Sequence, residues 1–250
     1  MAIVVRIAPT EALSLRDPQA TDLGQRILSH AIVELDALGL EAFTFRKLAA
    51  KVGCTEASVY RYFSSKHQLL LYLVAYYWDW VHHLINVAVT REQAPRARLR
   101  AALRALTHPS TPNPTVPYVD ERLLHRVVLA EGTKAYHLKE VDDVNEKGVF
   151  HGYKSLTAEL AALILAVVPD FPYPRALASS LFEMAHNHLY FAEHLPRLTD
   201  LQSGEGARER LEEMLVFWTE RLLASESRSE APNVGEATQR PGSVALATGE

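Results

Sequence analysis

The chain contains little of the chemistry that builds a catalytic or metal centre. Among its 250 residues the single cysteine, Cys54, can form neither an intramolecular disulfide nor a cluster of thiolate ligands. One cysteine also fits a reducing, cytoplasmic location. The sequence has no Gly-x-Ser-x-Gly, no Walker loop, no Gly-x-Gly-x-x-Gly and no His-Glu-x-x-His. We therefore expect no enzyme activity, no cofactor and no metal site.

The sequence also lacks the alternation of apolar and polar residues that amphipathic strands show, so we expect an all-α fold. One apolar stretch, residues 69–89, is long enough to cross a membrane. A span would place Asp79, His82, His83 and Asn86 in lipid, where polar groups are costly. The stretch therefore predicts a buried helix of a bundle, and no membrane partner. The start of the chain does not resemble a signal peptide.

Charge is distributed unevenly along the chain. The whole chain carries a net charge of −4, whereas residues 44–66 contain five basic residues and one acidic residue, Glu56. This segment is therefore at +4 and the remainder at −8. A small basic segment on an acidic body is the charge pattern expected of a DNA-binding head.

The basic segment, residues 44–66, has the pattern of two short helices joined by a glycine turn. Thr44 can cap the first helix, Gly53 lets the chain turn, and Thr55 can cap the second helix. Polar and basic groups occupy the face that the apolar residues leave uncovered. This arrangement predicts a helix-turn-helix, the motif that inserts its second helix into the DNA major groove.

Several short motifs support this interpretation: Phe43-Thr44, Arg46-Lys47-Leu48-Ala49, Gly53, Ser58-Val59-Tyr60, Tyr62-Phe63 and Lys66-His67-Gln68-Leu69-Leu70. Through them, about residues 25–72 closely resemble the tetracycline-repressor-like (TetR/AcrR) family of bacterial regulators. The resemblance implies that the remaining helices form a ligand pocket and a dimer interface. Repression is the default activity that it implies.

The residues expected to contact DNA lie near the starts of the two helices and just after the second. Ser58 and Ala57 can reach base edges, and Arg46 can reach a guanine or a phosphate. Lys66 and nearby tyrosines are expected to hold phosphates. Glu56 can accept a hydrogen bond from cytosine or stabilise the helix N-terminus. The full set is Thr44, Arg46, Thr55, Glu56, Ala57, Ser58, Tyr60, Arg61, Tyr62 and Lys66.

Prolines, glycines and capping residues divide the rest of the chain. We expect a first helix from Asp22 to Gly39 and, beyond the head, helices over residues 65–89, 96–106, 119–131, 145–168, 176–194 and 208–224. The expected organisation is a flexible arm (1–20), a DNA-binding head (21–66), an effector-binding and dimerisation body (67–224) and a disordered tail (225–250).

Aromatic and histidine residues recur in the body. They suit an apolar pocket with a few polar groups, although an ordinary helical core contains the same residue types. The pattern predicts a small, largely hydrophobic effector with one or two polar groups. The expected lining residues are Tyr76, Trp80, His83, His125, Phe150, Phe182, His186 and Tyr190.

The last two helices each carry an apolar stripe, so two copies can pack as a four-helix bundle and form a homodimer. The alternative is that both stripes face their own subunit. Trp218 is the candidate anchor, because large aromatic residues dominate interface energies. The expected interface residues are Leu181, Met184, Leu189, Leu211, Leu215, Trp218 and Leu222.

The predicted function is sequence-specific regulation of transcription: a repressor released from a palindromic operator in double-stranded DNA by a small apolar or aromatic ligand. Two alternatives remain open. One is a helical small-molecule-binding protein or enzyme in which the helix-turn-helix is incidental. The other is an architectural DNA binder without ligand control, which would show little sequence preference.

Overall fold

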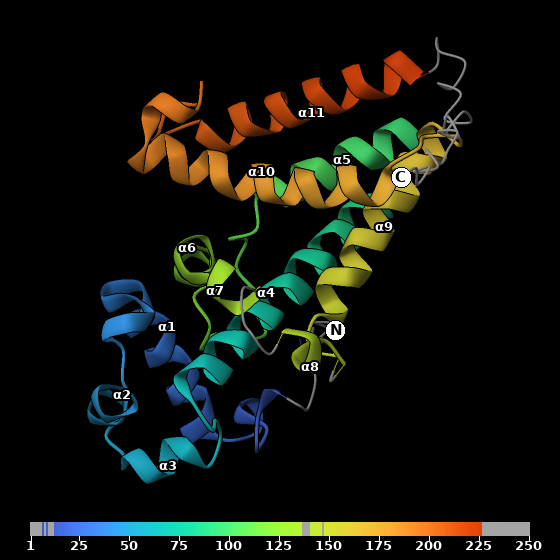
Figure 1. The fold of residues 1–250 in the computed structure, drawn as a ribbon. Helices are drawn as coiled ribbons and strands as arrows, with labels where there is room; N and C mark the ends of the chain where they lie inside the picture. Colours follow the sequence, from blue (N-terminus) through green and yellow to red (C-terminus); the bar gives the residue numbers. More distant parts are fainter. Residues whose placement is uncertain (1–6, 8, 10–12, 137–140, 147, 227–250) are drawn as a thin grey trace, which may run out of the picture.

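The computed structural model describes residues 7, 9, 13–136, 141–146 and 148–226, which form helices and connecting loops without a strand (Figure 1). The prediction of an all-α fold is confirmed. None of the described helices is both long enough and apolar enough to cross a membrane. The elements are η2 (Pro18–Ala20), α1 (Asp22–Ala42), α2 (Phe45–Val52), α3 (Glu56–Tyr60), α4 (Lys66–Val89), α5 (Pro95–Thr107), α6 (Glu121–Glu131), α7 (Thr133–Tyr136), α8 (Val141–Glu146), α9 (His151–Val167), α10 (Pro174–His194), η3 (Pro196–Leu198) and α11 (Ala207–Glu226).

Local capping sets the helices of the head. Thr44 Oγ1 accepts from the Lys47 amide at 3.3 Å at the start of α2. Gly53 ends that helix in the left-handed region with φ 73°, where a side chain would add strain. Thr55 Oγ1 then accepts from the Ser58 amide at 3.2 Å and starts α3. These contacts confirm the predicted helix-turn-helix.

The arm before α1 packs against the head over its described residues, contrary to the expectation of a flexible segment. Leu13 is buried, and Gln19 is only 8% exposed. The Gln19 amide Nε2 donates to the Ile7 carbonyl at 2.6 Å and to the Tyr72 hydroxyl at 2.8 Å. A long-range contact between the arm and α4 supplies partners that a sequence pattern does not show. The expected tail, apart from residues 225 and 226, lies outside the described residues.

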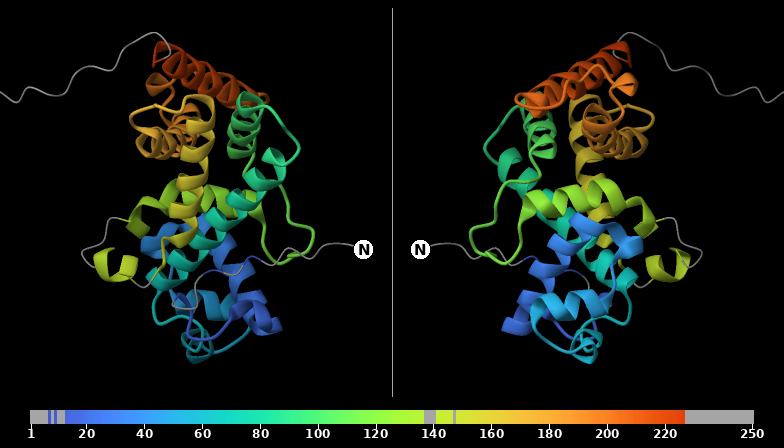
Figure 2. Two further views of the ribbon diagram at one scale, coloured as in Figure 1. Left: turned by 90° about the vertical axis from the view of Figure 1, so that its right-hand side faces the viewer. Right: turned by 90° about the vertical axis from the view of Figure 1, so that its left-hand side faces the viewer.

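Helix α4 joins the head to the body. It begins directly after the α3 turn, where Ser65 Oγ accepts from the Gln68 amide at 3.1 Å. The helix then runs through the middle of the molecule (Figures 1 and 2) and packs against α5, α6, α7 and α9. It is buried along most of its length, as its apolar composition predicts.

The far end of the body consists of α5, α9, α10 and α11. Helix α11 lies along α5 and α10, at the end of the molecule opposite the head (Figure 2). The helix expected over residues 145–168 is two helices, α8 and α9. Gly148 lies between them with φ 76°. This left-handed backbone conformation cannot continue a right-handed helix, so the helix is interrupted there.

Candidate DNA-binding head and cavities of the body

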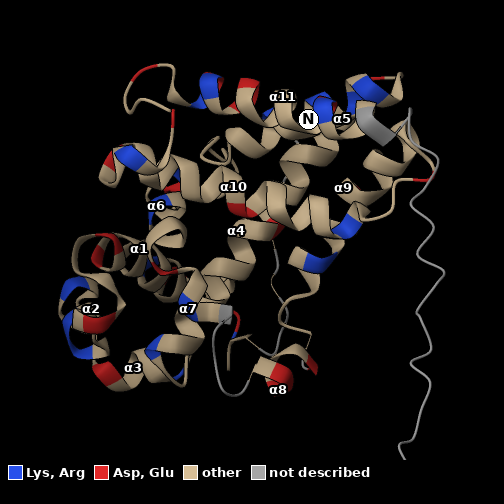
Figure 3. Ribbon diagram, turned by 45° about the horizontal axis from the view of Figure 1, so that its top comes forward, with Lys and Arg blue, Asp and Glu red and all other residues tan. Residues whose placement is uncertain are grey.

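The head exposes one group of the predicted DNA contacts. Phe45 at the start of α2 packs edge-on against Tyr60 at the end of α3, with ring centroids 5.0 Å apart, so the two helices present a common surface. Figure 3 shows basic residues on α2 and acidic residues on α8. The predicted contacts that are exposed in the head are Thr44, Arg46, Thr55, Glu56, Ala57, Tyr60 and Arg61.

Ser58 lies at the edge of this surface and is mostly buried. Its hydroxyl lies 2.8 Å from the Thr55 hydroxyl, and Arg61 Nη2 donates to it at 3.2 Å. The geometry therefore gives Ser58 a part in orienting Thr55 and Arg61. A direct base contact from Ser58, as expected from the sequence, requires these hydrogen bonds to be exchanged.

Tyr62 does not reach the surface on which it was expected. Its side chain is 2% exposed, and its hydroxyl lies 2.7 Å from the Thr21 hydroxyl at the start of α1. The Tyr62 carbonyl also accepts from the Leu15 amide at 2.8 Å. Tyr62 thus holds the arm and α1 against the turn after α3. This geometry does not support the predicted phosphate contact.

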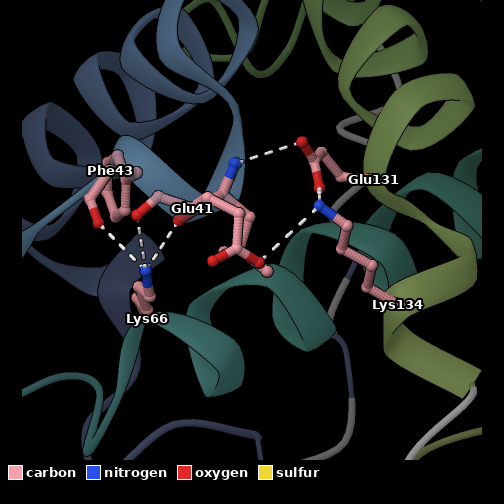
Figure 4. Close-up of polar contacts among 6 residues, drawn as sticks. Glu41, Phe43, Lys66, Glu131 and Lys134 are labelled. Carbon is pink, nitrogen blue, oxygen red and sulfur yellow. Dashed lines mark hydrogen bonds and ion pairs between the residues drawn. The ribbon is translucent and has the colours of Figure 1, made fainter.

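Lys66 is engaged inside the protein (Figure 4). Its ammonium donates to the carbonyl oxygens of Leu40, Glu41 and Phe43 at 2.8, 3.1 and 3.4 Å. These carbonyls belong to the end of α1, where backbone acceptors have no partner within the helix. The geometry gives Lys66 a helix-capping role in place of the phosphate contact expected from the sequence.

A second contact joins the same end of α1 to the body (Figure 4). Glu131, buried at the end of α6, accepts from the Leu40 amide through Oε1 at 3.1 Å. Its Oε2 lies 2.7 Å from Lys134 Nζ. The hydrogen bond to Glu131 raises the pKa of Lys134. We call Leu40, Lys66, Glu131 and Lys134 the α1 latch, because they fix the last turn of α1 to both α4 and α6.

The residues expected to form a ligand pocket do not line a single space. Trp80 Nε1 donates to the Thr111 carbonyl at 3.0 Å, and its ring stacks on His83. Tyr190 packs on His194 near the end of α10. The residues from this set that do come together are His125, Phe182 and His186, which surround Tyr77 and Trp78 on α4. Tyr76 is buried. Of the predicted lining residues, only His83 and Phe150 line the cavity between α4 and α9.

A cavity of about 480 Å³ lies between α4 and the start of α9. On α4 its walls include Ala75, Trp78 and His82, which are three or four residues apart and therefore share a face. The rings of Phe150 and Tyr153 form the opposite side, and the Trp78 and Tyr153 centroids are 4.7 Å apart. The sequence reasoning missed Trp78 and Tyr153. The spacing 75, 78, 82 was the signal that could have found this face. The whole lining is Ile7, Leu71, Val74, Ala75, Trp78, Asp79, His82, His83, Asn86, Val149, Phe150, His151, Gly152 and Tyr153.

Asp79 is the acidic group of this cavity. Burial raises its pKa to about 6, although His82 and His151 act in the opposite direction. A Cβ atom on Gly152 would lie 2.0 Å from Asp79 Oδ1, so the carboxylate packs directly on the first turn of α9. Only glycine permits this approach. The partial positive charge of the α9 N-terminus offsets part of the cost of the buried carboxylate.

Three of the expected dimer contacts lie in the core of their own subunit. Leu181, Leu211 and Leu215 have no exposed surface. Helix α11 packs on α5 and α10 of the same chain. This burial does not support the predicted dimer contacts of these three residues. Met184, Leu189 and Trp218 are partly buried, and Trp218 packs edge-on against His188. Leu222 and Phe217 on α11 are exposed.

Comparisons with known proteins agree with this architecture. A family model for bacterial regulatory proteins of the tetR family matches residues 27–73. The nucleoid occlusion factor SlmA of Shewanella sediminis (strain HAW-EB3) is 32% identical over 138 residues, covering 51% of this chain and 69% of that protein. SlmA of Shewanella pealeana is 29% identical over 154 residues, covering 57% of this chain and 77% of that protein.

Solved structures share the fold at low sequence identity. A transcriptional regulator from Rhodococcus sp. Rha1 has a TM-score of 0.59 at 18% identity, covering 82% of this chain and 97% of that one. AibR, in complex with isovaleryl coenzyme A and operator DNA, has a TM-score of 0.52 at 18% identity, covering 77% and 95%. These similarities extend the likeness from the head to the helical body.

Proposed function

Because the chain belongs to the tetR family of bacterial regulatory proteins, we propose that it is a DNA-binding transcriptional regulator that represses from a palindromic operator as a homodimer. The exposed surface shared by α2 and α3 carries this proposal. It combines Arg46, Tyr60 and Arg61 with the capped start of a helix that can enter the major groove. One such head makes few contacts, so two heads acting on half-sites about 34–36 Å apart supply the affinity.

Selection of bound sequences from a random DNA pool tests this proposal. We expect a palindromic consensus whose half-sites are separated by about one helical turn. Arg46→Ala should change the preference at defined base pairs, whereas Tyr60→Phe, at an exposed tyrosine expected to hold a phosphate, should weaken all sequences alike. A pool without a consensus, or with a lone half-site, would contradict the proposal.

The proposed effector site is the cavity beside Trp78. Its aromatic walls suit a largely hydrophobic molecule, and Asp79, His82 and His83 provide polar groups for orientation. Helix α4 both lines the cavity and starts beside the DNA-binding head, so a displacement of α4 moves the head. AibR was crystallised with a coenzyme A thioester together with operator DNA, which shows that a protein of this fold accommodates both. A coupling of about 1–3 kcal/mol is sufficient for control.

Titration of aromatic and lipid-like compounds, with and without operator, tests ligand control. Ala75→Phe fills the cavity from α4 and should remove the ligand response while DNA binding persists. Ala88→Phe lies on the same helix away from this cavity and is the matched control. An effector must lose affinity in the presence of operator by the same factor by which it weakens operator binding. Compounds that bind equally with and without operator would contradict ligand control.

A second candidate function follows from the names of the two curated relatives compared above, which are nucleoid occlusion factors. This candidate would bind many chromosomal sites and need no effector. A chromosome-wide map of bound sites separates the two. Binding confined to a few promoters supports the regulator, and binding at many sites outside promoters supports the second candidate.

A further inference from the structure

A second cavity, of about 670 Å³, lies between α6, α10 and the start of α11. Its apolar walls come from Leu129, Leu189 and Ala192, and its polar groups include His125 and Arg208. None of its lining residues belongs to the cavity beside Trp78. It is therefore a separate site, on the face of the body that contains α6 and the α10–α11 loop.

His125 contributes a buried ring nitrogen that has no hydrogen-bond partner within the described part of the chain. The side chain is 3% exposed, and its Nδ1 lies 3.0 Å from the Tyr77 hydroxyl. The same hydroxyl lies 2.9 Å from His186 Nε2. The His125 Nε2 atom is buried and makes no hydrogen bond to any residue that the structure describes. An unpaired buried polar atom is costly, so a ligand atom that pairs with it is favoured.

The direction of the hydrogen bond between the Tyr77 hydroxyl and His125 Nδ1 determines whether His125 Nε2 is a donor or an acceptor. If Tyr77 donates to His125 Nδ1, the neutral His125 ring carries its own proton on Nε2. The Tyr77 oxygen can then accept from His186 Nε2. This arrangement satisfies both contacts of the Tyr77 hydroxyl with the two histidines, and it leaves the Nε2–H donor of His125 for a ligand.

The charges around His125 favour a ligand that is an anion. Arg208, in the first turn of α11, donates to the Ser110 hydroxyl at 2.5 Å. Burial, His186 and Arg208 all lower the pKa of His125, so the ring stays neutral beside a cation. Glu193 and Glu209 also line the cavity, but both are exposed and neither contributes to this shift.

The other two arginines of the cavity are less suited to hold an anion, because one is already paired and the other is exposed to solvent. Arg126 is paired with Asp36 at 2.6 Å, and Arg122 is exposed. The loop before α11 is fixed, because Arg210 Nη2 donates to the carbonyl oxygens of Gln202 and Glu205 at 2.8 and 3.2 Å. The N-terminus of α11 therefore adds its partial positive charge from a defined position.

We propose that this cavity binds a small carboxylic acid with a short apolar tail. One carboxylate oxygen accepts from His125 Nε2–H, and the other lies against the Arg208 guanidinium and the α11 N-terminus. The tail packs on Leu129 and Leu189. The inference goes beyond the proposed function, because it concerns binding at a second site and does not depend on operator recognition.

Calorimetric titration of the full chain without DNA tests the proposal, with octanoate as the probe and octanol and octyl phosphate as comparisons. Octanoate should saturate one site per chain, and octanol should bind at least about tenfold more weakly, because it lacks the charge. Arg208→Met should weaken octanoate by about tenfold or more. Arg104→Met is the matched control on an exposed arginine that pairs with Glu212 on another face, and it should leave octanoate binding unchanged.

A second measurement needs no variant at the site. In a sample with ¹⁵N-labelled histidine, octanoate should shift the His125 Nε2 resonance, while the resonance of exposed His194 stays in place. Absence of octanoate binding, equal binding by Arg208→Met, or binding without a His125 shift would each overturn the proposal. Octyl phosphate binding about tenfold more tightly than octanoate would overturn the assignment to a carboxylate. Because DNA is absent, these outcomes are independent of the regulator's own test.

Discussion

Two tyrosines that are two residues apart in the head have opposite surroundings. Tyr60 is 47% exposed at the end of α3, whereas Tyr62 is buried and shares a hydrogen bond with Thr21. Tyr60→Phe should weaken operator binding by about fivefold, because the proposed phosphate contact is lost, and leave the melting temperature unchanged. Tyr62→Phe makes the same chemical change and should lower stability instead. Operator titrations and thermal melts of both variants check this, and a larger binding loss for Tyr62→Phe would contradict it.

Lys66 provides the second prediction at this scale. Replacing it with Met retains the aliphatic stem but leaves three carbonyl oxygens of the α1 end without their cation. Unfolding in urea should show a loss of about 2 kcal/mol. Lys51→Met, at an exposed lysine 3.6 Å from Glu34, should cost about 0.5 kcal/mol or less. Unchanged stability of Lys66→Met, with a flatter salt dependence of DNA binding, would restore the phosphate role.

At the residue scale, the sequence predicted what depends on neighbours along the chain. Thr44, Gly53 and Thr55 cap and turn the head as expected, because these contacts lie within a few residues. The sequence did not show the contacts whose partners are distant along the chain. The Thr21 hydroxyl that binds Tyr62 is 41 residues away, and the carbonyls that bind Lys66 are 23 to 26 residues away. No local pattern reveals such partners.

At the scale of elements, the positions of most helices were predictable, since prolines, glycines and caps mark them. Which face of each helix packs against which neighbouring helix was not predictable. Asp79 on α4 meets Gly152 on α9, and this contact helps to decide which side of α4 faces a cavity. The sequence showed a row of aromatic residues but not the rotation of α4 that separates Trp78 from Trp80.

The contact between α4 and α9 should make stability depend on pH. The pKa of Asp79 is about 6 in the folded protein, against an ordinary value of 3.8. Between these values the folded state holds its proton while the unfolded state has lost it, so stability falls as pH rises from about 4 to 6. The Asp79→Asn side chain does not titrate, so this variant should not show the fall in stability. The difference in unfolding free energy between Asp79→Asn and the wild type should therefore be larger at pH 7 than at pH 4. A difference that is the same at both pH values would contradict the prediction.

At the scale of the whole molecule, the exposed face of α11 is the proposed dimer surface. Phe217 is 56% exposed and Leu222 lies on the same helix, at the end opposite the head. Phe217→Arg should place a charge in the interface and give monomers at micromolar concentration, as measured by light scattering. Val33→Arg, an equally drastic change at an exposed position of α1, is the control and should stay dimeric. If Phe217→Arg remains dimeric, the dimer interface lies on another surface.

The α1 latch has a consequence for how the molecule opens. The Leu40 amide is bound by Glu131, which is 91 residues later in the chain, so it is protected only while α6 is docked on the head. Hydrogen exchange at this single amide therefore reports separation of body and head, although Leu40 itself belongs to the head. In Glu131→Gln, a neutral acceptor without the charge, exchange of Leu40 should accelerate by about tenfold while that of Ile32 stays slow. If both amides accelerate together, head and body open as one cooperative unit.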